Sequence, residues 1–290
     1  MKTEILVTGA EGFVGRRLTA ALRAQGREVA GIGRAHGDIA SCDLPFTSLK
    51  HVFHLAARMF VPASWENPRE FYSTNVMGAV NVLELCRRER ASLTLVSSYT
   101  YGPPRTLPIT EDHPIGAYNP YSQTKIIAEE IAQFYASHFG IAVSIVRPFN
   151  LYGPEQNERF LIPSLVRQAI DPSWPAIRVA DPRPRRDYLY IDDFIALLLA
   201  VHSAGETGVY NAGSGRSVSI SDLVAILNRI TGCDKPLLSE GHERPAEIMD
   251  VVADISRAAE RLRWRPAVSL EQGLAGMVRA ASNKAGYSGN

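Results

Sequence analysis

Short, nearly continuous apolar runs recur along the first half of the chain. They lie at Glu4–Thr8, Glu28–Ile32, His51–Leu55, Leu93–Ser97 and Ala142–Arg147. Runs of this length without polar alternation are typical of strands that are covered on both faces, as in a parallel sheet. The pattern therefore predicts a parallel sheet with a helical layer on each side.

Helical stretches separate these runs. Val14–Gln25 has apolar residues at helical spacing and is closed by Gly26, and Tyr121–Phe139 is closed in the same way by Gly140. Asn75–Arg88 shows the same periodicity. Because strands and helices alternate along the chain, we predict an α/β fold built on a Rossmann-type, doubly wound parallel sheet.

The pattern changes after residue 150, where prolines and arginines crowd into an irregular segment at 171–186. Helical periodicity returns at Asp192–His202, Ser221–Thr231 and Gly273–Ala281. This second half has fewer and shorter candidate strands than the first. We therefore expect a smaller C-terminal lobe beside the main sheet.

Composition changes this picture little. The 290 residues carry 31 Lys and Arg against 30 Asp and Glu, so no basic excess indicates a nucleic-acid partner and no basic amphipathic helix indicates a membrane partner. Cys42, Cys86 and Cys233 lie far apart, and no Cys/His spacing matches a zinc site, so we expect no metal. The chain enters a strand at once, without an apolar leader or a membrane-length run, and we expect a cytoplasmic protein.

The first motif with chemical meaning is TGAEGFVG, which places Gly9, Gly12 and Gly15 between the first strand and the first helix. Glycines allow a tight turn and let backbone N–H groups approach a pyrophosphate at the helix N-terminus. The GxxGxxG spacing after a strand and before a helix therefore predicts a dinucleotide site.

The end of the second strand indicates which dinucleotide is bound. An acidic residue there would accept a hydrogen bond from the ribose 2′-hydroxyl of NAD, but this chain has Gly33 followed by Arg34. Arg34 could pair with a 2′-phosphate, which favours NADP weakly over NAD, although a solvated arginine at a strand end is a close alternative. Asp43 and Leu44 fit a contact to the adenine, or a polar surface turn.

The second motif is YSQTK, with Tyr121 and Lys125 one helical turn apart on the same face. A tyrosine hydroxyl is a poor base at its usual pKa near 10, and a nearby ammonium favours the phenolate and lowers that pKa. Tyr121 could then exchange a proton with a substrate hydroxyl or carbonyl while a hydride moves to or from the cofactor. Lys125 is expected to hydrogen-bond the nicotinamide ribose as well.

A third piece, VSSYTYG, follows the fourth strand, where a catalytic hydroxyl is expected. Counting from the strand favours Ser98, and counting back from Gly102 favours Ser97. We predict Ser98, and Ser97 stays open as the alternative.

Together these motifs resemble the extended short-chain dehydrogenases, the NAD-dependent epimerase/dehydratase family. TGAEGFVG, HLAA at 54–57, SSYTYG, NPYSQTK and RPFNLYGPEQ occur in order, and RRDYLYIDDF and GVYNAGSG extend the resemblance into the second half. The resemblance implies a Rossmann domain over residues 1–150, to which 187–212 return, and a substrate-binding lobe from 151–186 and 213–282. It also implies an NAD(P) cofactor, a nucleotide-diphosphate sugar as substrate, and a homodimer.

The resemblance implies further site residues at matching positions. The catalytic residues would be Ser98, Tyr121 and Lys125. Besides the three glycines, the cofactor would be contacted by Phe13, Val14, Leu55, Ala56, Ala57, Asn75 and Pro148. The substrate would be contacted by Ser98, Asn150, Arg186 and Arg244, with the two arginines gripping its diphosphate, as guanidinium groups suit phosphate oxygens.

Three activities of this family compete for the chain. The 4,6-dehydratases carry Asp-Glu directly after the catalytic hydroxyl residue, whereas Ser98 is followed by Tyr99 and Thr100, so dehydration is disfavoured. The 4-epimerases typically have an acidic residue after the second strand, which is absent here. The short region from Arg34 to Lys50 resembles reductases of GDP-linked 4-keto-6-deoxy sugars.

We therefore predict a reductase acting on a GDP- or dTDP-4-keto-6-deoxyhexose. The alternative is an NAD-dependent 4-epimerase like UDP-glucose 4-epimerase. A remote alternative is a non-catalytic NADP-binding sensor, which the presence of both Tyr121 and Lys125 disfavours.

Overall fold

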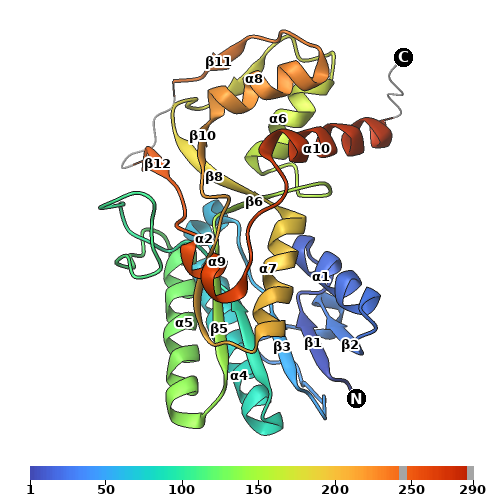
Figure 1. The fold of residues 1–290 in the computed structure, drawn as a ribbon, viewed down its shortest axis with the longest axis vertical. Helices are drawn as coiled ribbons and strands as arrows, with labels where there is room; N and C mark the ends of the chain where they lie inside the picture. Colours follow the sequence, from blue (N-terminus) through green and yellow to red (C-terminus); the bar gives the residue numbers. More distant parts are fainter. Residues whose placement is uncertain (242–246, 286–290) are drawn as a thin grey trace.

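The computed structural model of the chain describes residues 1–241 and 247–285. It shows a larger lobe built on a parallel sheet and a smaller lobe stacked at one end of it (Figure 1). The large sheet has six strands in the order β2-β1-β3-β4-β5-β9, and all of its pairings are parallel. Its strands are β1 (Ile5–Thr8), β2 (Val29–Ile32), β3 (His51–His54), β4 (Ser92–Val96), β5 (Val143–Pro148) and β9 (Gly208–Ala212). The predicted fold class is confirmed.

Helices cover the large sheet on both faces. Leu6 of β1 points into a core shared with α4 (Gly78–Glu89) and α5 (Pro120–Phe139). Ile5 and Val7, its neighbours along the strand, point the other way, into a core shared with α1 (Phe13–Ala24), α7 (Ile191–Ala204) and α9 (Ser256–Leu262). Both faces of β1 are therefore apolar, which explains why the strand reads as an unbroken hydrophobic run.

The helix that carries the YSQTK motif has well-defined ends. Asn119 caps α5, since its Oδ1 accepts a hydrogen bond from the backbone N–H of Ser122 at 2.7 Å, and Pro120 occupies the first helical position. Gly140 ends the helix with φ +69°, a conformation that glycine adopts without strain. The strong cap holds the first turn of α5, where Tyr121 lies.

The connection between β2 and β3 is short. It contains one 3-10 turn, η1 (Arg34–His36), and no strand within residues 33–50. Instead, Ile39, Leu44, Phe46 and Leu49 bury their side chains in the core beside α4. The region that the sequence analysis singled out as short therefore adds no strand to the sheet, and β2 forms its edge.

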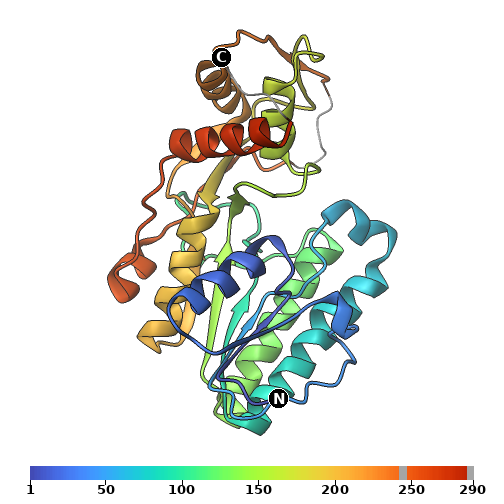
Figure 2. The same cartoon turned by 90° about the vertical axis from the view of Figure 1, so that its right-hand side faces the viewer.

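Within the described residues, the smaller lobe contains two small sheets and three helices. One sheet has β10 (Ser217–Ser219), β8 (Arg185–Tyr190) and β12 (Asp250–Val251), with β6 (Asn150–Tyr152) also pairing with β8, and the other pairs β7 (Ile177–Val179) with β11 (Leu237–Ser239). The helices are α6 (Leu161–Ile170), α8 (Ile220–Thr231) and α10 (Leu270–Ala285). Figure 2 shows how this lobe caps the same end of the sheet at which α7 begins.

Two predicted elements differ in detail. The segment 187–212, expected to return to the Rossmann domain, begins within β8, which pairs with strands of the smaller lobe, so the chain re-enters the larger lobe through α7 and β9. The helix expected from Asn75 begins earlier: α2 (Val61–Glu66) and α3 (Pro68–Phe71) precede a π-helical turn, η2 (Tyr72–Met77), that leads into α4. Asn75 thus lies inside a π turn, a feature that periodicity does not reveal. None of the helices in the described parts of the chain is long and apolar enough to span a membrane.

Candidate functional site

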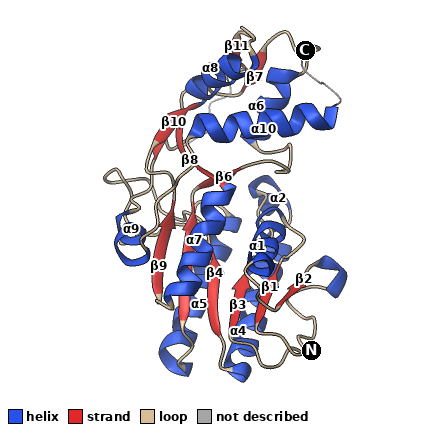
Figure 3. Cartoon of the chain, turned by 45° about the vertical axis from the view of Figure 1, so that its right-hand side comes forward, coloured by secondary structure: helices blue, strands red, loops and turns tan. Residues whose placement is uncertain are grey.

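The carboxyl ends of the parallel strands all point toward the smaller lobe, as Figure 3 shows for β3, β4 and β9. In open α/β sheets this edge is where ligands bind. The glycine loop follows β1 at this edge, HLAA follows β3, SSYTYG follows β4 and the PFN segment follows β5. The fold therefore brings these four motifs to the same edge of the sheet.

The glycine loop has no room for side chains at two of its positions. Gly9 has φ +69°, and a Cβ there would lie 2.9 Å from the backbone nitrogen of Ala56. A Cβ on Gly15 would lie 2.1 Å from the carbonyl oxygen of Gly9. Gly12 caps α1 without a side-chain hydrogen bond, and the first turn of α1 carries no acidic residue. The amide groups at this helix end are therefore open to an anion, and the loop fits a dinucleotide pyrophosphate.

A buried threonine, which the sequence analysis missed, holds the strand ends beneath the loop. Thr8 accepts hydrogen bonds on Oγ1 from the backbone N–H groups of Leu55 (3.2 Å) and Ala56 (3.1 Å) and lies 2.8 Å from Nδ1 of His54. Burial lowers the pKa of His54 to about 3, so this ring is neutral at physiological pH. The signal for Thr8 was present, as a hydroxyl residue that ends an apolar strand directly before a glycine.

Asn75 is buried and uses its whole amide within the protein. Its Oδ1 accepts from the backbone N–H of Arg58 at 2.8 Å, and its Nδ2 donates to the carbonyl of Arg58 at 3.0 Å and to Oγ1 of Thr124 at 2.9 Å. This side chain therefore ties the loop after β3 to the first turns of α5. Its position beside the predicted cofactor site fits a residue that orients the site.

Tyr121 and Ser98 meet at the end of β4. The Ser98 hydroxyl forms a hydrogen bond with Tyr121, whereas Oγ of Ser97 is buried without a partner among the described residues. Burial raises the pKa of Tyr121, and the hydrogen bond from Ser98 partly opposes this shift. Of the two serines left open by the sequence, Ser98 is the one in contact with the tyrosine.

Lys125 is buried at the floor of the same site. Its Nζ donates a hydrogen bond of 2.6 Å to the carbonyl oxygen of Val96, and burial lowers its pKa from 10.5 to about 8, against the opposing charge of Glu129. The sequence predicted that this ammonium would lower the pKa of Tyr121. In the structure the pKa of Tyr121 is raised instead, because burial outweighs the other effects on it.

A polar cluster extends from the tyrosine toward the smaller lobe. The Tyr99 hydroxyl lies within hydrogen-bonding reach of Asn150 and Arg186, and its ring stacks on Phe149 with the centroids 5.0 Å apart. Asn150 also donates through Nδ2 to the carbonyl of Asp187 at 3.0 Å. Two predicted substrate contacts, Asn150 and Arg186, thus lie around one aromatic residue that the sequence analysis used only to argue against dehydration.

Arg186 is already engaged. Its guanidinium forms a close ion pair with Glu247 and donates to the carbonyl of Ile248 at 2.7 Å. Both charged side chains are mostly buried, at 17% and 21% exposed. Arg244, the second arginine predicted to grip the diphosphate, lies outside the described residues.

The other predicted cofactor contacts line the rim of the site. Phe13, Val14 and Ala57 are half-buried and Pro148 is buried at the end of β5. Asp43 and Arg34 are exposed, while Leu44 is buried in the main core. The Leu44 side chain is therefore not available to an adenine, whereas the Asp43 carboxylate is open to solvent.

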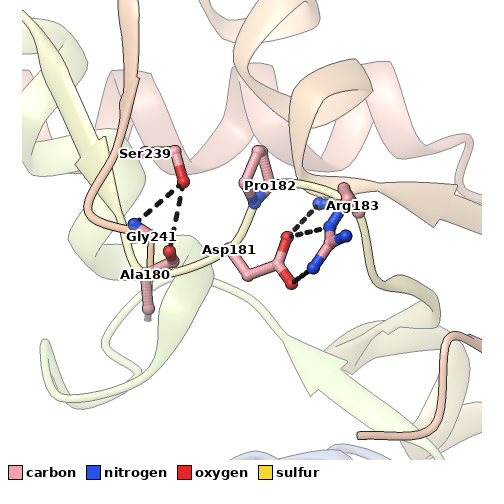
Figure 4. Close-up of a pocket in the computed structure, with 6 residues that line it drawn as sticks. All are labelled: Ala180, Asp181, Pro182, Arg183, Ser239 and Gly241. Atoms are coloured by element: carbon pink, nitrogen blue, oxygen red, sulfur yellow. Dashed lines mark hydrogen bonds and ion pairs between the residues drawn. The ribbon is translucent and has the colours of Figure 1, made fainter. Parts of the chain in front are cut away.

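A separate shallow pocket lies in the smaller lobe between the β7–β11 pair and the loop before β8 (Figure 4). Asp181 and Arg183 form an ion pair at 2.8 Å on its wall, and Ser239 bridges the Ala180 carbonyl and the Gly241 N–H. Its lining contains none of the predicted site residues. The polar groups drawn in Figure 4 bond to one another, so this pocket does not extend the site at the strand ends.

Comparison with known proteins identifies the family of the chain. The model of the NAD dependent epimerase/dehydratase family matches residues 5–213. The chain belongs to this family. The family resemblance of the motifs is thereby confirmed, and the chain is an enzyme of this epimerase/dehydratase group.

Relatives of this epimerase/dehydratase enzyme span its whole length. UDP-glucose 4-epimerase from Mycolicibacterium smegmatis is 30% identical over 96% of this chain and 98% of its own. Among solved structures, RMD from Pseudomonas aeruginosa complexed with NADPH is 28% identical with a TM-score of 0.88, covering 97% of this chain and 99% of that one. MoeE5 in complex with UDP-glucose and NAD is 27% identical with a TM-score of 0.88 and the same coverage.

Proposed function

We propose that this enzyme catalyses NAD(P)-dependent redox chemistry at C4 of a nucleotide-diphosphate sugar, as a 4-epimerase. The observation that carries the proposal is the contact of Ser98 with Tyr121 at the end of β4, one helical turn from Lys125 and beside the glycine loop. A phenol, an ammonium and a hydroxyl at the ligand-binding edge of a Rossmann sheet suit proton transfer to a carbinol or carbonyl. The relation to UDP-glucose 4-epimerase supports the epimerase over other outcomes.

Each residue of the proposed site has its own role in this reaction. A dinucleotide held by the glycine loop would supply the acceptor and donor of hydride, and the positive charge of its oxidised form would favour the Tyr121 phenolate. Tyr121 would take the proton of the sugar 4-hydroxyl during oxidation at C4, and would return it to the oxygen when the 4-keto carbon is reduced from the opposite face. Ser98 holds the reacting oxygen through its hydroxyl. Lys125 orients the cofactor ribose and keeps a positive charge under the phenol.

The diphosphate of the substrate would be held by the polar cluster at the smaller lobe. Arg186 has the fork geometry for phosphate oxygens, and Tyr99 and Asn150 lie within hydrogen-bonding reach of it. Because Glu247 holds the guanidinium in this structure, a diphosphate would take over the contacts that Glu247 makes. Arg244 completes the proposed grip.

The reductase predicted from the sequence is the second candidate. The short β2–β3 connection favours it, and the similar RMD structure was obtained with NADPH. Such an enzyme would deliver hydride once to a GDP- or dTDP-linked 4-keto-6-deoxy sugar, and Arg34 would contact the 2′-phosphate. The two candidates differ in net consumption of the cofactor.

A turnover assay separates them. We expect UDP-glucose or UDP-glucuronic acid to give the 4-epimer without net change in NADH absorbance at 340 nm. Net loss of that absorbance with a 4-keto-6-deoxy sugar nucleotide would replace the epimerase with the reductase. If neither class of substrate turned over, the proposed redox chemistry at C4 would be wrong.

Tyr121→Phe tests the proton-transfer role directly. It is expected to lower turnover about 10²–10⁴-fold while dinucleotide affinity stays close to that of the wild type. Tyr135→Phe is the matched control, since this phenol lies on the same helix but bonds Glu84 at 2.7 Å, away from the strand ends. Equal activity of the two variants would remove Tyr121 from the mechanism.

We also propose that the enzyme works as a cytoplasmic homodimer. Phe134 on α5 and Met77 at the end of η2 expose 52% and 51% of their surfaces, which supports an apolar contact between copies on the helical face of the large lobe. Light scattering of the purified protein would show the dimer mass. A monomer over the micromolar range would contradict this part of the proposal.

A further inference from the structure

A carboxylate without a protein partner lies at the end of the glycine loop next to β2. Glu11 is exposed, and no residue in the described parts of the chain gives it a hydrogen bond or an ion pair. Glu11 was not among the cofactor contacts predicted from the sequence, because it occupies one of the variable positions of the GxxGxxG motif. Its position is nevertheless well defined by packing.

The glycine loop rests on two glycines of the β2 segment. A Cβ on Gly31 would lie 2.7 Å from Cβ of Ala10, and a Cβ on Gly33 would lie 2.3–2.7 Å from the carboxyl atoms of Glu11. Gly33 continues the strand in an extended conformation, with φ −142° and ψ −164°, so the two glycines share one face of the chain. The absence of a side chain at Gly33 is what lets the carboxylate lie against the strand end.

The backbone holds this arrangement in register. The N–H of Ala10 donates to the carbonyl of Ile32 at 3.0 Å, which fixes the loop one residue before Glu11 against the last residue of β2. The N–H of Gly33 donates to Nδ1 of His36 at 3.2 Å, which fixes the start of η1. Both sides of the contact between Glu11 and Gly33 are therefore anchored.

The end of β2 is the place from which Rossmann domains supply the acidic residue that bonds the ribose 2′-hydroxyl. In this chain the residue at that place is a glycine, and the Glu11 carboxylate fills the space above it. A carboxylate accepts hydrogen bonds from ribose hydroxyls and repels the two negative charges of a 2′-phosphate. Arg34, the opposing candidate, is exposed on η1 and has no contact in the described structure that directs it toward the same space.

We propose that Glu11 selects NAD(H) against NADP(H) by taking the place of the missing acidic residue after β2. The inference rests on the dinucleotide site of the proposed function, and it reverses the weak preference for NADP that Arg34 suggested. The role of Glu11 depends on Gly33, because any side chain at position 33 would displace the Glu11 carboxylate.

Cofactor binding tests the proposal without relying on turnover. The protein, stripped of any nucleotide it carries, is titrated with NADH and with NADPH by fluorescence, and the ratio of the two dissociation constants is compared among variants. The wild type is expected to bind NADH about ten-fold or more tightly than NADPH. Glu11→Gln keeps the shape of the side chain and removes its charge. It is expected to lower the preference for NADH, measured as the NADPH dissociation constant divided by that of NADH, about ten-fold.

A second variant and a control make the result specific. Gly33→Ala keeps the charge of Glu11 but pushes its carboxylate away from the end of β2. This variant is therefore also expected to lower the preference for NADH over NADPH. Glu130→Gln, which removes an exposed carboxylate from α5, is expected to leave the ratio unchanged. An unchanged ratio in Glu11→Gln, or a wild type that prefers NADPH and loses that preference in Arg34→Ala, would overturn the proposal. A chain that shows the shifted ratio but no epimerisation would refute only the proposed function.

Discussion

At the scale of single residues, the site combines groups whose chemistry burial has changed. Lys125 and Tyr121 are both desolvated by the residues around them, which opposes the charged form of each side chain. The pKa of Lys125 is lowered to about 8, so this amine titrates in an accessible pH range. A residue that is costly to bury in its charged form and has no packing advantage is typical of a functional position.

The first residue-scale prediction concerns the pH profile. Because the proposed role of Lys125 needs its ammonium form, turnover is expected to fall as the pH rises through about 8. The measurement is kcat/KM between pH 6 and 10, with Lys125→Arg as the control whose charge persists over this range. A wild-type profile that stays flat to pH 10 would contradict the lowered pKa.

The second residue-scale prediction concerns stability. A lysine whose pKa is lower in the folded than in the unfolded state destabilises the fold wherever both states are protonated, that is, below about pH 8. Lys125→Met should therefore be inactive yet more stable at pH 7, by roughly 1–2 kcal/mol after the lost bond to Val96 is counted. The advantage should shrink between pH 8 and 10.5, as the wild-type amine loses its proton first in the folded state. Denaturant unfolding of the wild type and Lys125→Met at pH 7 and pH 10 measures this difference in unfolding free energy. The same difference at both pH values would contradict a buried charge on Lys125.

At the scale of elements, the glycine loop is shaped by close backbone contacts on both sides. Gly9 touches the start of the segment after β3, and Gly15 lies against Gly9 itself. These contacts let α1 begin directly over the strand ends, with its uncapped N-terminus facing the site. The close contacts therefore hold the glycine loop in a conformation that suits an anion, and they leave little room for a side chain at Gly9 or Gly15.

Gly15→Ala tests the loop as a unit. The added Cβ would lie 2.1 Å from the Gly9 carbonyl oxygen and 2.7 Å from Cα of Ala10, so the backbone must shift. Dinucleotide affinity is expected to fall about ten-fold or more, with roughly 1–3 kcal/mol of lost stability. Gly276→Ala on α10, where the nearest atom is 3.4 Å away, is the control and should keep full affinity. Calorimetric titration with NADH measures both, and full affinity in Gly15→Ala would contradict the packing described.

At the scale of the whole molecule, a single buried carboxylate joins strands of both lobes. Asp187 on β8 accepts hydrogen bonds from the backbone N–H groups of Ser214 (2.6 Å), Gly215 (3.0 Å) and Ala253 (3.1 Å). Ser214 and Gly215 follow β9 of the large sheet, whereas β8 belongs to the smaller lobe. This carboxylate therefore ties β8, the strand that carries Arg186, to the loop that follows β9 of the large sheet.

Removing it should loosen both lobes together. Asp187→Ala leaves the buried N–H of Ala253 and the partly buried N–H groups of Ser214 and Gly215 without this acceptor, and is expected to cost roughly 2–4 kcal/mol of unfolding free energy. Glu158→Ala breaks an exposed pair with Arg167 and should leave the thermal midpoint almost unchanged. Thermal unfolding followed by circular dichroism compares the two. A similar midpoint for both variants would show that the lobes are held together elsewhere.

The sequence by itself determined the class of fold, the glycine loop and the helix with Tyr121 and Lys125. These features rest on local signals: unbroken apolar strands, glycines at fixed spacing, and two side chains one helical turn apart. Such signals need no knowledge of which segments meet in space. The π turn at Asn75 escaped this reading because it breaks no hydrophobic pattern.

Only the tertiary structure decided which residues touch. It chose Ser98 over Ser97 as the partner of Tyr121, engaged Arg186 with Glu247, and laid Glu11 against Gly33. It also reversed the expected pKa shift of Tyr121, because burial depends on everything packed around a group and not on its neighbour one turn away. Contacts and desolvation arise between segments far apart in the chain, and for this reason they became visible only once the chain was folded.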